Sequence, residues 1–293
     1  EQGKYLRWHA GDEISFFPMA YNMQYQFQGE TGDRSGKLKA EDNNLGNQTM
    51  DEVFVIYPYN PDYRINTEQK AVIASLPSVQ SYKKGSYGKN GNIMVATSEF
   101  SAFTLKSVCG WLKVQLTGYG EKVQSIKLRG NNGEQVAGNV YVEADDATLI
   151  LSSTEAEAGE ATGGTLSFEN SVVTELTLNC DGVALGAEAT SFYLALPPQE
   201  FTNGFTVEIW GQDANGNELK MVKKSEAALT IERNVIQPLE AVAYEGKPTS
   251  LTAAFSAVDS TMFPAMHGMP GIYLINVSNE AGDLGQLLFY DNT

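Results

Sequence analysis

Residues 111–140 read WLKVQLTGYG EKVQSIKLRG NNGEQVAGNV, and this stretch decides the fold class. Its apolar residues stand two positions apart, as in Leu112-Val114-Leu116 and Ile126-Leu128. That period is typical of strands with one buried face and not of helices. Asn132-Gly133, and later Asn215-Gly216, stand between strand-like segments, where a tight hairpin turn needs a positive φ. The stretch therefore predicts a β-sandwich.

The same alternation continues to Leu239, and a less regular set of strand-like segments precedes it. Among these, Val53-Val55-Tyr57 is expected to be a strand that Pro58 ends, because proline cannot continue a ladder. A chain of 293 residues is long enough for two domains of about 100–200 residues each. We expect an N-terminal β-sandwich domain at residues 1–104, a C-terminal β-sandwich domain at 105–246 and a strand-forming tail at 247–293.

The composition and charge exclude several classes of protein. With 42% hydrophobic residues the chain can bury sizeable cores, so it is not a disordered chain. The formal net charge of −16 argues against nucleic acid and against an anionic membrane surface as partners. Residues 134–218 hold fifteen Asp or Glu and no Lys or Arg. Either this is a solvated acidic surface, or it meets the more basic segment 81–133 when copies stack.

No catalytic, cofactor-binding or metal-ligating residues are predicted, and the chain is not expected to be an enzyme. A Ser-His-Asp site needs a histidine near an activated serine, but His9 neighbours the expected core residue Trp8 and His267 lies in a Met/Pro/Gly loop. Structural or surface roles are expected for both histidines. The 36 acidic residues give many carboxylate pairs, which carry no information without geometry. Asp213-x-Asn215-x-Asn217 resembles the start of a calcium loop, but the sixth position is Glu218 where that loop needs glycine. A hairpin turn is the better interpretation.

Cys109 and Cys180 lie at strand-like positions and outside any C-x-x-C pair. They are either two small core residues or one disulfide between strands, since a disulfide also needs the two Cα atoms to be close. No apolar run approaches the roughly 20 residues that span a membrane. No basic-then-apolar signal segment opens the chain either, so we expect any export signal to have been removed.

Several tyrosines crowd two loop regions, and four of them are candidate ligand contacts: Tyr59, Tyr63, Tyr82 and Tyr87. Aromatic rings with a polar edge suit the binding of sugars or partner surfaces. The alternative is that these rings clamp their loops onto the sandwich.

Short motifs in order along residues 5–245 carry a family resemblance. They include WHAGDEI at 8–14, IYPY at 56–59, MVATSEF at 94–100, GWLKVQLTG at 110–118, SIKLRGNNGEQVAG at 125–138 and IERNVI at 231–236. With these motifs the chain resembles the fimbrillin-like pilins and adhesins of Bacteroidales, the FimA/Mfa type. The resemblance implies two transthyretin-like β-sandwich domains in tandem and no cofactor. It also implies export as a lipoprotein precursor and display in a fimbria outside the outer membrane.

The resemblance further implies assembly by donor-strand exchange, in which a strand of one subunit completes a sheet of the next. The expected partners are other fimbrial subunits, identical or different, and a host or bacterial surface glycan or protein. Contact with the membrane is expected only through a lipid anchor on the precursor. The candidate donor residues lie in the tail: Ile272, Leu274 and Val277, or Leu287 and Phe289. The tail is longer than one strand requires, so it could instead pack on its own chain or begin a further domain.

The sequence thus predicts a fimbrial subunit or tip adhesin without catalysis. The alternative is a surface glycan-binding protein of a nutrient-uptake system, which the tyrosine loops favour.

Overall fold

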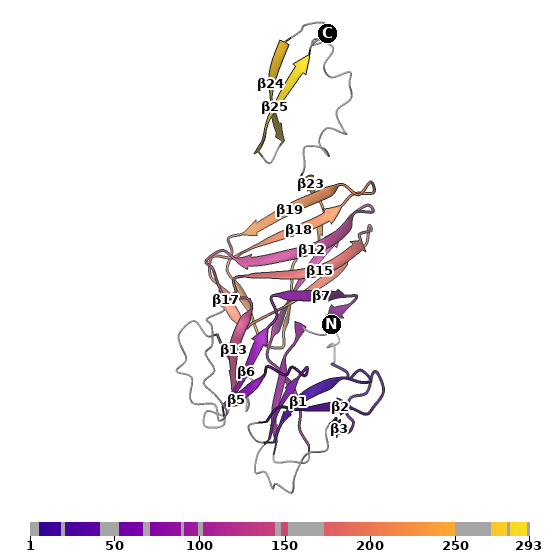
Figure 1. Cartoon of the computed structure of the whole chain (residues 1–293), viewed down its shortest axis with the longest axis vertical. Helices are drawn as coiled ribbons and strands as arrows, with labels where there is room; N and C mark the ends of the chain where they lie inside the picture. The colour runs from indigo at the N-terminus through magenta and orange to yellow at the C-terminus, as the bar shows by residue number, and fades with distance from the viewer. Residues whose placement is uncertain are drawn as a thin grey trace.

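A computed structural model describes residues 6–18, 21–41, 53–66, 71–88, 91–98, 102–143, 148–151, 173–249, 271–279 and 282–291. The named elements in these ranges are all β-strands, which confirms the all-β fold class. Figure 1 shows the strands gathered into sheets, with β1, β2 and β3 in the lower part of the view and β12, β15, β18 and β19 side by side above them.

The first sheet has six strands in the order β10-β9-β4-β1-β2-β3, and every neighbouring pair is antiparallel. The strands are β1 (Glu13–Phe17), β2 (Met23–Phe27), β3 (Leu38–Ala40), β4 (Val53–Tyr57), β9 (Met94–Ser98) and β10 (Lys106–Ser107). All five residues of β4, VFVIY, are buried, as suits a central strand of β-branched and aromatic residues. The predicted strand that ends before Pro58 is confirmed.

A four-stranded sheet in the order β14-β13-β6-β5 packs on the six-stranded sheet. Its strands are β5 (Arg64–Asn66), β6 (Ala71–Leu76), β13 (Gly138–Glu143) and β14 (Thr148–Leu151). The two sheets enclose a core, here called the first core, to which Phe54, Ile56 and Val95 contribute from one sheet and Val72 and Val140 from the other. The lower part of the molecule is therefore a β-sandwich.

A second sandwich follows the same principle. Its larger sheet has seven strands in the order β23-β19-β18-β12-β15-β7-β8. They are β7 (Val79–Lys83), β8 (Ser86–Tyr87), β12 (Lys122–Gly130), β15 (Glu175–Ala184), β18 (Phe205–Gln212), β19 (Glu218–Ser225) and β23 (Lys247–Pro248). The facing sheet consists of β11 (Gly110–Thr117), β16 (Thr190–Leu196), β21 (Ile236–Pro238) and β22 (Val242–Ala243). A separate pair is formed by β17 (Gln199–Phe201) and β20 (Leu229–Ile231).

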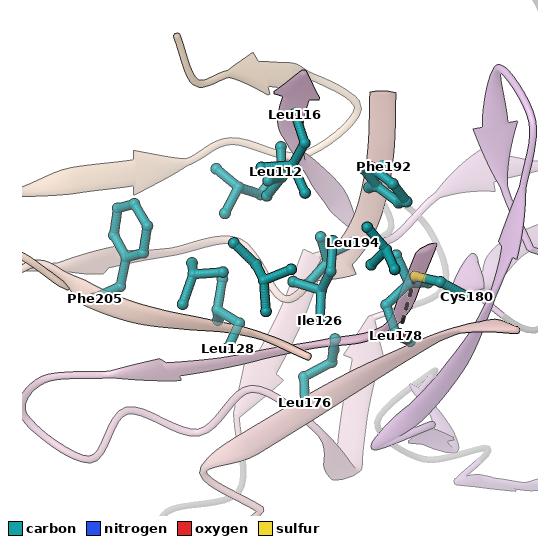
Figure 2. Packing of buried hydrophobic residues seen from close by; sticks show 14 of the residues in the cluster. Leu112, Leu116, Ile126, Leu128, Leu176, Leu178, Cys180, Phe192, Leu194 and Phe205 are labelled. Atoms are coloured by element: carbon teal, nitrogen blue, oxygen red, sulfur yellow. Dashed lines mark hydrogen bonds between the residues drawn. The ribbon is translucent and has the colours of Figure 1, made fainter. Parts of the chain in front are cut away.

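Alternate residues of these strands fill the second core. Figure 2 shows Leu112, Leu116, Phe192 and Leu194 on one side of it, and Ile126, Leu128, Leu176 and Leu178 on the other. All of these side chains are fully buried. The two-residue period that predicted the sandwich is thus the period with which side chains point alternately into this core.

Strands from both sides of residue 104 share sheets. β6 pairs with β13 along its whole length, and β7 runs parallel to β15. The side chain of Gln80 in β7 also links the two parts of the chain. It donates to the carbonyl of Ala195 in β16 at 2.8 Å and accepts from the N–H of Ala195 at 2.9 Å. The division at residue 104 stays a prediction; each of the two sandwiches contains strands from both sides of that residue.

Only one of the two Asn-Gly pairs closes a hairpin. Gly216, with a φ of +85°, connects β18 and β19, which pair in register from Gln212↔Glu218 to Phe205↔Ser225. Gly133 has a φ of +75°, but β12 and β13 lie in different sheets. The expected hairpin at Asn132-Gly133 is therefore wrong: the turn there carries the chain from one sheet to another.

In the tail, β24 (Gly271–Asn279) and β25 (Gly282–Asp291) form an antiparallel two-stranded sheet. In the described part of the chain these two strands pair only with each other. The described residues contain no helix that is long and apolar enough to span a membrane.

Candidate functional site: an aromatic cleft on the six-stranded sheet

The six-stranded sheet has apolar side chains on both faces. In β4, Phe54 and Ile56 point into the first core, while Val55 and Tyr57 lie on the opposite, outer face. Such alternation places successive side chains on opposite faces of a strand. Ile14 of β1 and Ala96 of β9 join Val55 and Tyr57 in a buried cluster on that outer face. The floor of the candidate site lies on this outer face and consists of Phe16, Tyr25, Tyr57 and Met94, from β1, β2, β4 and β9.

The segment before β1 forms one wall of the site. Trp8 is fixed by its backbone, which donates to the carbonyl of Asp33 at 3.0 Å and accepts from the N–H of Gly32 at 2.8 Å. Its ring stacks on Phe27 with centroids 4.8 Å apart and meets Tyr57 edge-on at 6.0 Å. A second wall comes from the segment between β9 and β10, where Phe103 and Leu105 are partly buried against the outer cluster.

Between these walls lies a cavity of about 780 Å³, here called the aromatic cleft. Its lining is mostly apolar, with aromatic rings from several elements. It consists of Leu6, Arg7, Trp8, Asp12, Phe16, Tyr25, Arg34, Ser35, Gly36, Lys37, Leu38, Tyr57, Tyr87, Met94, Ala102, Phe103, Thr104 and Leu105.

A buried carboxylate holds the floor of the cleft to its wall. Asp12 is 4% exposed; its Oδ2 accepts from the N–H of His9 at 2.8 Å, and its Oδ1 accepts from the hydroxyl of Tyr57 at 3.3 Å. Burial, followed by the nearby Asp12 charge, raises the pKa of Tyr57, so this phenol stays a hydrogen-bond donor. The turn at Gly11, with a φ of +79°, brings Asp12 to this position. The WHAGD motif thus builds one corner of the cleft.

The residues that line the cleft carry a net positive charge, whereas the whole chain is negative. Three cationic residues, Arg7, Arg34 and Lys37, line it, against the single acidic residue Asp12. The whole chain carries −16. A local excess of positive charge around a partly apolar cavity favours the approach of anionic groups.

Of the four tyrosines expected to contact a ligand, Tyr87 alone lines the cleft. Its ring stacks on Trp111 at 5.1 Å, and burial raises its pKa to about 12 although a hydrogen bond with Asn92 lowers it. Tyr63 is 4% exposed within the first core, so it is not a surface contact, and the prediction for it is wrong. Tyr82 packs on Phe192 at 5.2 Å beside the second core. Tyr59 is half-buried after β4, and its role stays a prediction.

Several ring-bearing and polar residues of the cleft could not be selected from the sequence pattern. They include Trp8, Phe16, Tyr25, Phe103 and Asp12. Trp8 and Asp12 stand in a motif that carried the family resemblance, which was a usable signal. Phe16 and Tyr25 are brought together, with ring centroids 4.6 Å apart, by the pairing of β1 with β2, which the sequence pattern did not reveal.

The two cysteines are free and buried, each in a different core: Cys109 in the first and Cys180 in the second. The two-core-residue interpretation therefore holds in this structure, and the disulfide does not. Burial raises the pKa of each thiol to about 12.

The turn at Asp213 confirms the hairpin interpretation of the calcium-like motif. The carboxylate of Asp213 accepts from the N–H of Asn215 at 2.8 Å and from the N–H of Asn217 at 2.9 Å. The Asp213 carboxylate therefore stabilises the turn between β18 and β19. Among the residues that the structure describes, no group of three His, Cys, Asp or Glu side chains could hold a metal ion.

The candidate donor residues lie in the β24–β25 hairpin. Ile272 is paired with Tyr290, Leu274 with Leu288, Val277 with Gly285, Leu287 with Ile275 and Phe289 with Tyr273. Their role in assembly stays a prediction.

No protein-family model matches the chain, and no curated protein does. Among solved structures, a proposed cell adhesion protein from Bacteroides ovatus is similar at 13% identity and a TM-score of 0.48, over 81% of this chain and 84% of that one. A proposed cell adhesion protein from Bacteroides uniformis is 14% identical with a TM-score of 0.38, over 82% and 89% of the two chains. One from Bacteroides fragilis is 7% identical with a TM-score of 0.41, over 85% and 88%.

Proposed function

We propose that this chain is a non-catalytic adhesive subunit of the cell surface that holds its ligand in the aromatic cleft. The cleft itself carries the proposal. Its volume of about 780 Å³ lies within the range of ligand sites, which are mostly apolar with a few placed polar groups. Among its lining residues, Asp12 is the one carboxylic acid, and its oxygens already accept from Tyr57 and His9. Glycoside hydrolysis needs two facing carboxylates, so binding without turnover suits this lining better.

Beads coated with the full chain test this function under flow over glass coated with mucin, with fibronectin or with albumin. We expect retention on mucin or fibronectin that exceeds retention on albumin. Replacement of a cleft wall, Phe103→Ser, is expected to reduce it at least about fivefold, which corresponds to about 1 kcal/mol. The matched control is Tyr119→Ser, because Tyr119 is 94% exposed and lies outside the cleft. Retention that is equal on all three surfaces would contradict the proposal.

We further propose that subunits assemble by strand exchange through the β24–β25 hairpin. The support is the family resemblance together with the pairing of these two strands only with each other in the described part of the chain. An edge strand offers unpaired N–H and C=O groups to a further strand. The four-stranded sheet ends in β5 and β14, which are the acceptor edges that we favour.

Light scattering on the full chain tests the assembly. We expect multimers that grow with concentration, and we expect Ile272→Lys combined with Leu274→Lys to abolish them. Ser278→Lys combined with Asn279→Lys adds the same charge near the turn of the hairpin and should leave them intact. A chain that stays monomeric at every concentration would refute the exchange and leave the adhesive cleft untouched.

A glycan-binding protein of a nutrient-uptake system is the second candidate function. The aromatic lining of the cleft favours it as well, because rings with polar neighbours suit sugars. The two functions share the binding step and differ in whether the ligand is fixed to a surface or released for uptake.

A further inference from the structure

We infer that the ligand of the aromatic cleft is an acidic saccharide, that is, a sugar ring carrying a carboxylate or a sulfate group. This inference rests on the proposed adhesive function, because it names the ligand of the same site.

At the floor of the cleft, a ligand meets side chains and not unpaired backbone groups. The floor is formed by β9, β4, β1 and β2, and each of these strands pairs with a neighbour on both sides. Where these strands pair, their N–H and C=O groups are used within the sheet. A peptide that binds as an added strand needs an unpaired edge, so a floor of this kind argues against a peptide strand lying on it.

The rings of the cleft suit a ligand with a flat apolar face. Phe16 and Tyr25 lie 4.6 Å apart at an angle of 41°, and both are half-buried. Trp8 stands on one wall and Phe103 on the other. A pyranose presents C–H groups on its faces and hydroxyl groups at its edge, so it can contact rings and hydrogen-bond at once. Ser35, Thr104 and the cationic side chains are polar groups in reach of such an edge.

The balance of charge selects an acidic ligand over a neutral one. Arg7 and Lys37 line the cleft and are exposed, so they stand on its solvent side. Asp12 is buried, and its carboxylate is engaged by Tyr57 and His9. Arginine binds carboxylate or sulfate oxygens through two parallel N–H bonds, and such charge-assisted bonds are about twice as strong as neutral ones.

Calorimetric titration of the full chain tests the inference with two acidic probes and one neutral probe. Hexagalacturonate supplies carboxylates, a chondroitin sulfate hexasaccharide adds sulfates, and cellohexaose is neutral. We expect at least one acidic probe to bind with a Kd of about 10 μM to 1 mM, and at least about tenfold more tightly than cellohexaose. The acidic probe that binds identifies the group.

Two charge-matched double variants locate the binding. Arg7→Gln with Lys37→Gln should weaken the acidic probe at least about tenfold, roughly the loss of one charge-assisted hydrogen bond. Lys84→Gln with Lys223→Gln removes the same charge from exposed positions outside the cleft and should change the Kd less than about twofold. All four positions are exposed, so folding is expected to be unaffected. Phe103→Ser, checked for folding by circular dichroism, should abolish the binding.

The other outcomes overturn either the inference or the adhesive function on which it rests. Equal binding of cellohexaose would show that the ligand needs no acidic group. Poly-glutamate is titrated as a control that carries carboxylates without sugar rings, and equal binding of it would show that the cleft recognises charge and not a sugar. Equal losses in the two double variants would place the binding elsewhere. If no probe binds while beads still adhere through Phe103, the adhesive function stands and the ligand class is wrong. If a probe binds but beads do not adhere, the adhesive function fails and the saccharide site remains.

Discussion

The hydroxyl of Tyr57 donates to Oδ1 of Asp12 across 3.3 Å, which joins the end of β4 to the turn before β1 beneath the aromatic cleft. The same carboxylate accepts from the N–H of His9, next to the wall residue Trp8. Floor and wall of the cleft are thus held by one buried acid.

Removing the hydroxyl should loosen this corner. Tyr57→Phe leaves Oδ1 of the buried Asp12 without this donor, which costs about 1–3 kcal/mol of the free energy of unfolding. Urea unfolding followed by fluorescence measures the difference. Tyr119→Phe removes a hydroxyl from a 94% exposed side chain and should change stability by less than about 0.5 kcal/mol. Equal effects of the two substitutions would mean that the Asp12 bond does not stabilise the fold.

A side chain at Gly216 should destabilise the fold only through the positive φ of this residue. A Cβ at Gly216 would meet nothing within 4 Å, but its φ is +85°. Gly216→Ala is therefore expected to cost about 1–2 kcal/mol, the penalty of the left-handed conformation for an L-residue. Gly186→Ala is the matched control, because a Cβ there also meets nothing within 4 Å and its φ is not in that region. Thermal unfolding compares the two, and a control as destabilised as Gly216→Ala would refute the backbone explanation.

Glu208 should make stability depend on pH. Its carboxylate lies 2.8 Å from Nζ of Lys220 and 3.0 Å from Nη1 of Arg129. The hydrogen bond with Lys220, first, and that with Arg129 lower the pKa of Glu208 below its ordinary value of 4.5. A carboxyl with a lowered folded-state pKa contributes stability above the unfolded-state pKa, and the contribution is lost as pH falls through the folded-state value.

Glu208→Gln is therefore expected to lower the free energy of unfolding at pH 7 by at most about 1 kcal/mol, since the cations are partly exposed to solvent. The difference from wild type should shrink as the pH falls below about 4. Urea unfolding across this pH range measures it. Glu226→Gln, which changes an 83% exposed carboxylate, should show no such pH dependence. A difference that grows toward low pH would contradict the sign of the pKa shift.

Both thiols should be inert in the folded protein. Cys109 and Cys180 are buried, and their pKa values are raised to about 12, so almost no thiolate is present at pH 8. A disulfide-exchange reagent that reports free thiols should find none in the native protein and both after denaturation. Reducing agent should leave the unfolding midpoint unchanged. A midpoint that falls on reduction would show that a disulfide forms after all.

The sequence pattern predicted the strands well because their period depends only on neighbouring residues. Leu112, Val114 and Leu116 enter the second core as that period requires. It could not predict that β7 lies parallel to β15, or that β13 leaves β12 for β6, because pairing between distant strands leaves no local signal.

The cleft was hidden for the same reason. Trp8, Tyr57 and Phe103 come from three separate segments, and only the sheet brings them together. Tyr63 stands in a loop region crowded with tyrosines, which suggested a ligand contact, but its ring is buried in the first core. The position of an aromatic residue in a loop does not show whether its ring packs the loop onto the sandwich or contacts a ligand.

Retention of coated beads under flow, compared between the wild-type chain and Phe103→Ser, tests the central claim most directly. We predict that beads coated with the wild-type chain are held on mucin or fibronectin more strongly than on albumin. This retention should fall at least about fivefold with Phe103→Ser and stay unchanged with Tyr119→Ser. Retention that Phe103→Ser leaves unchanged would contradict the claim that the aromatic cleft is the adhesive site.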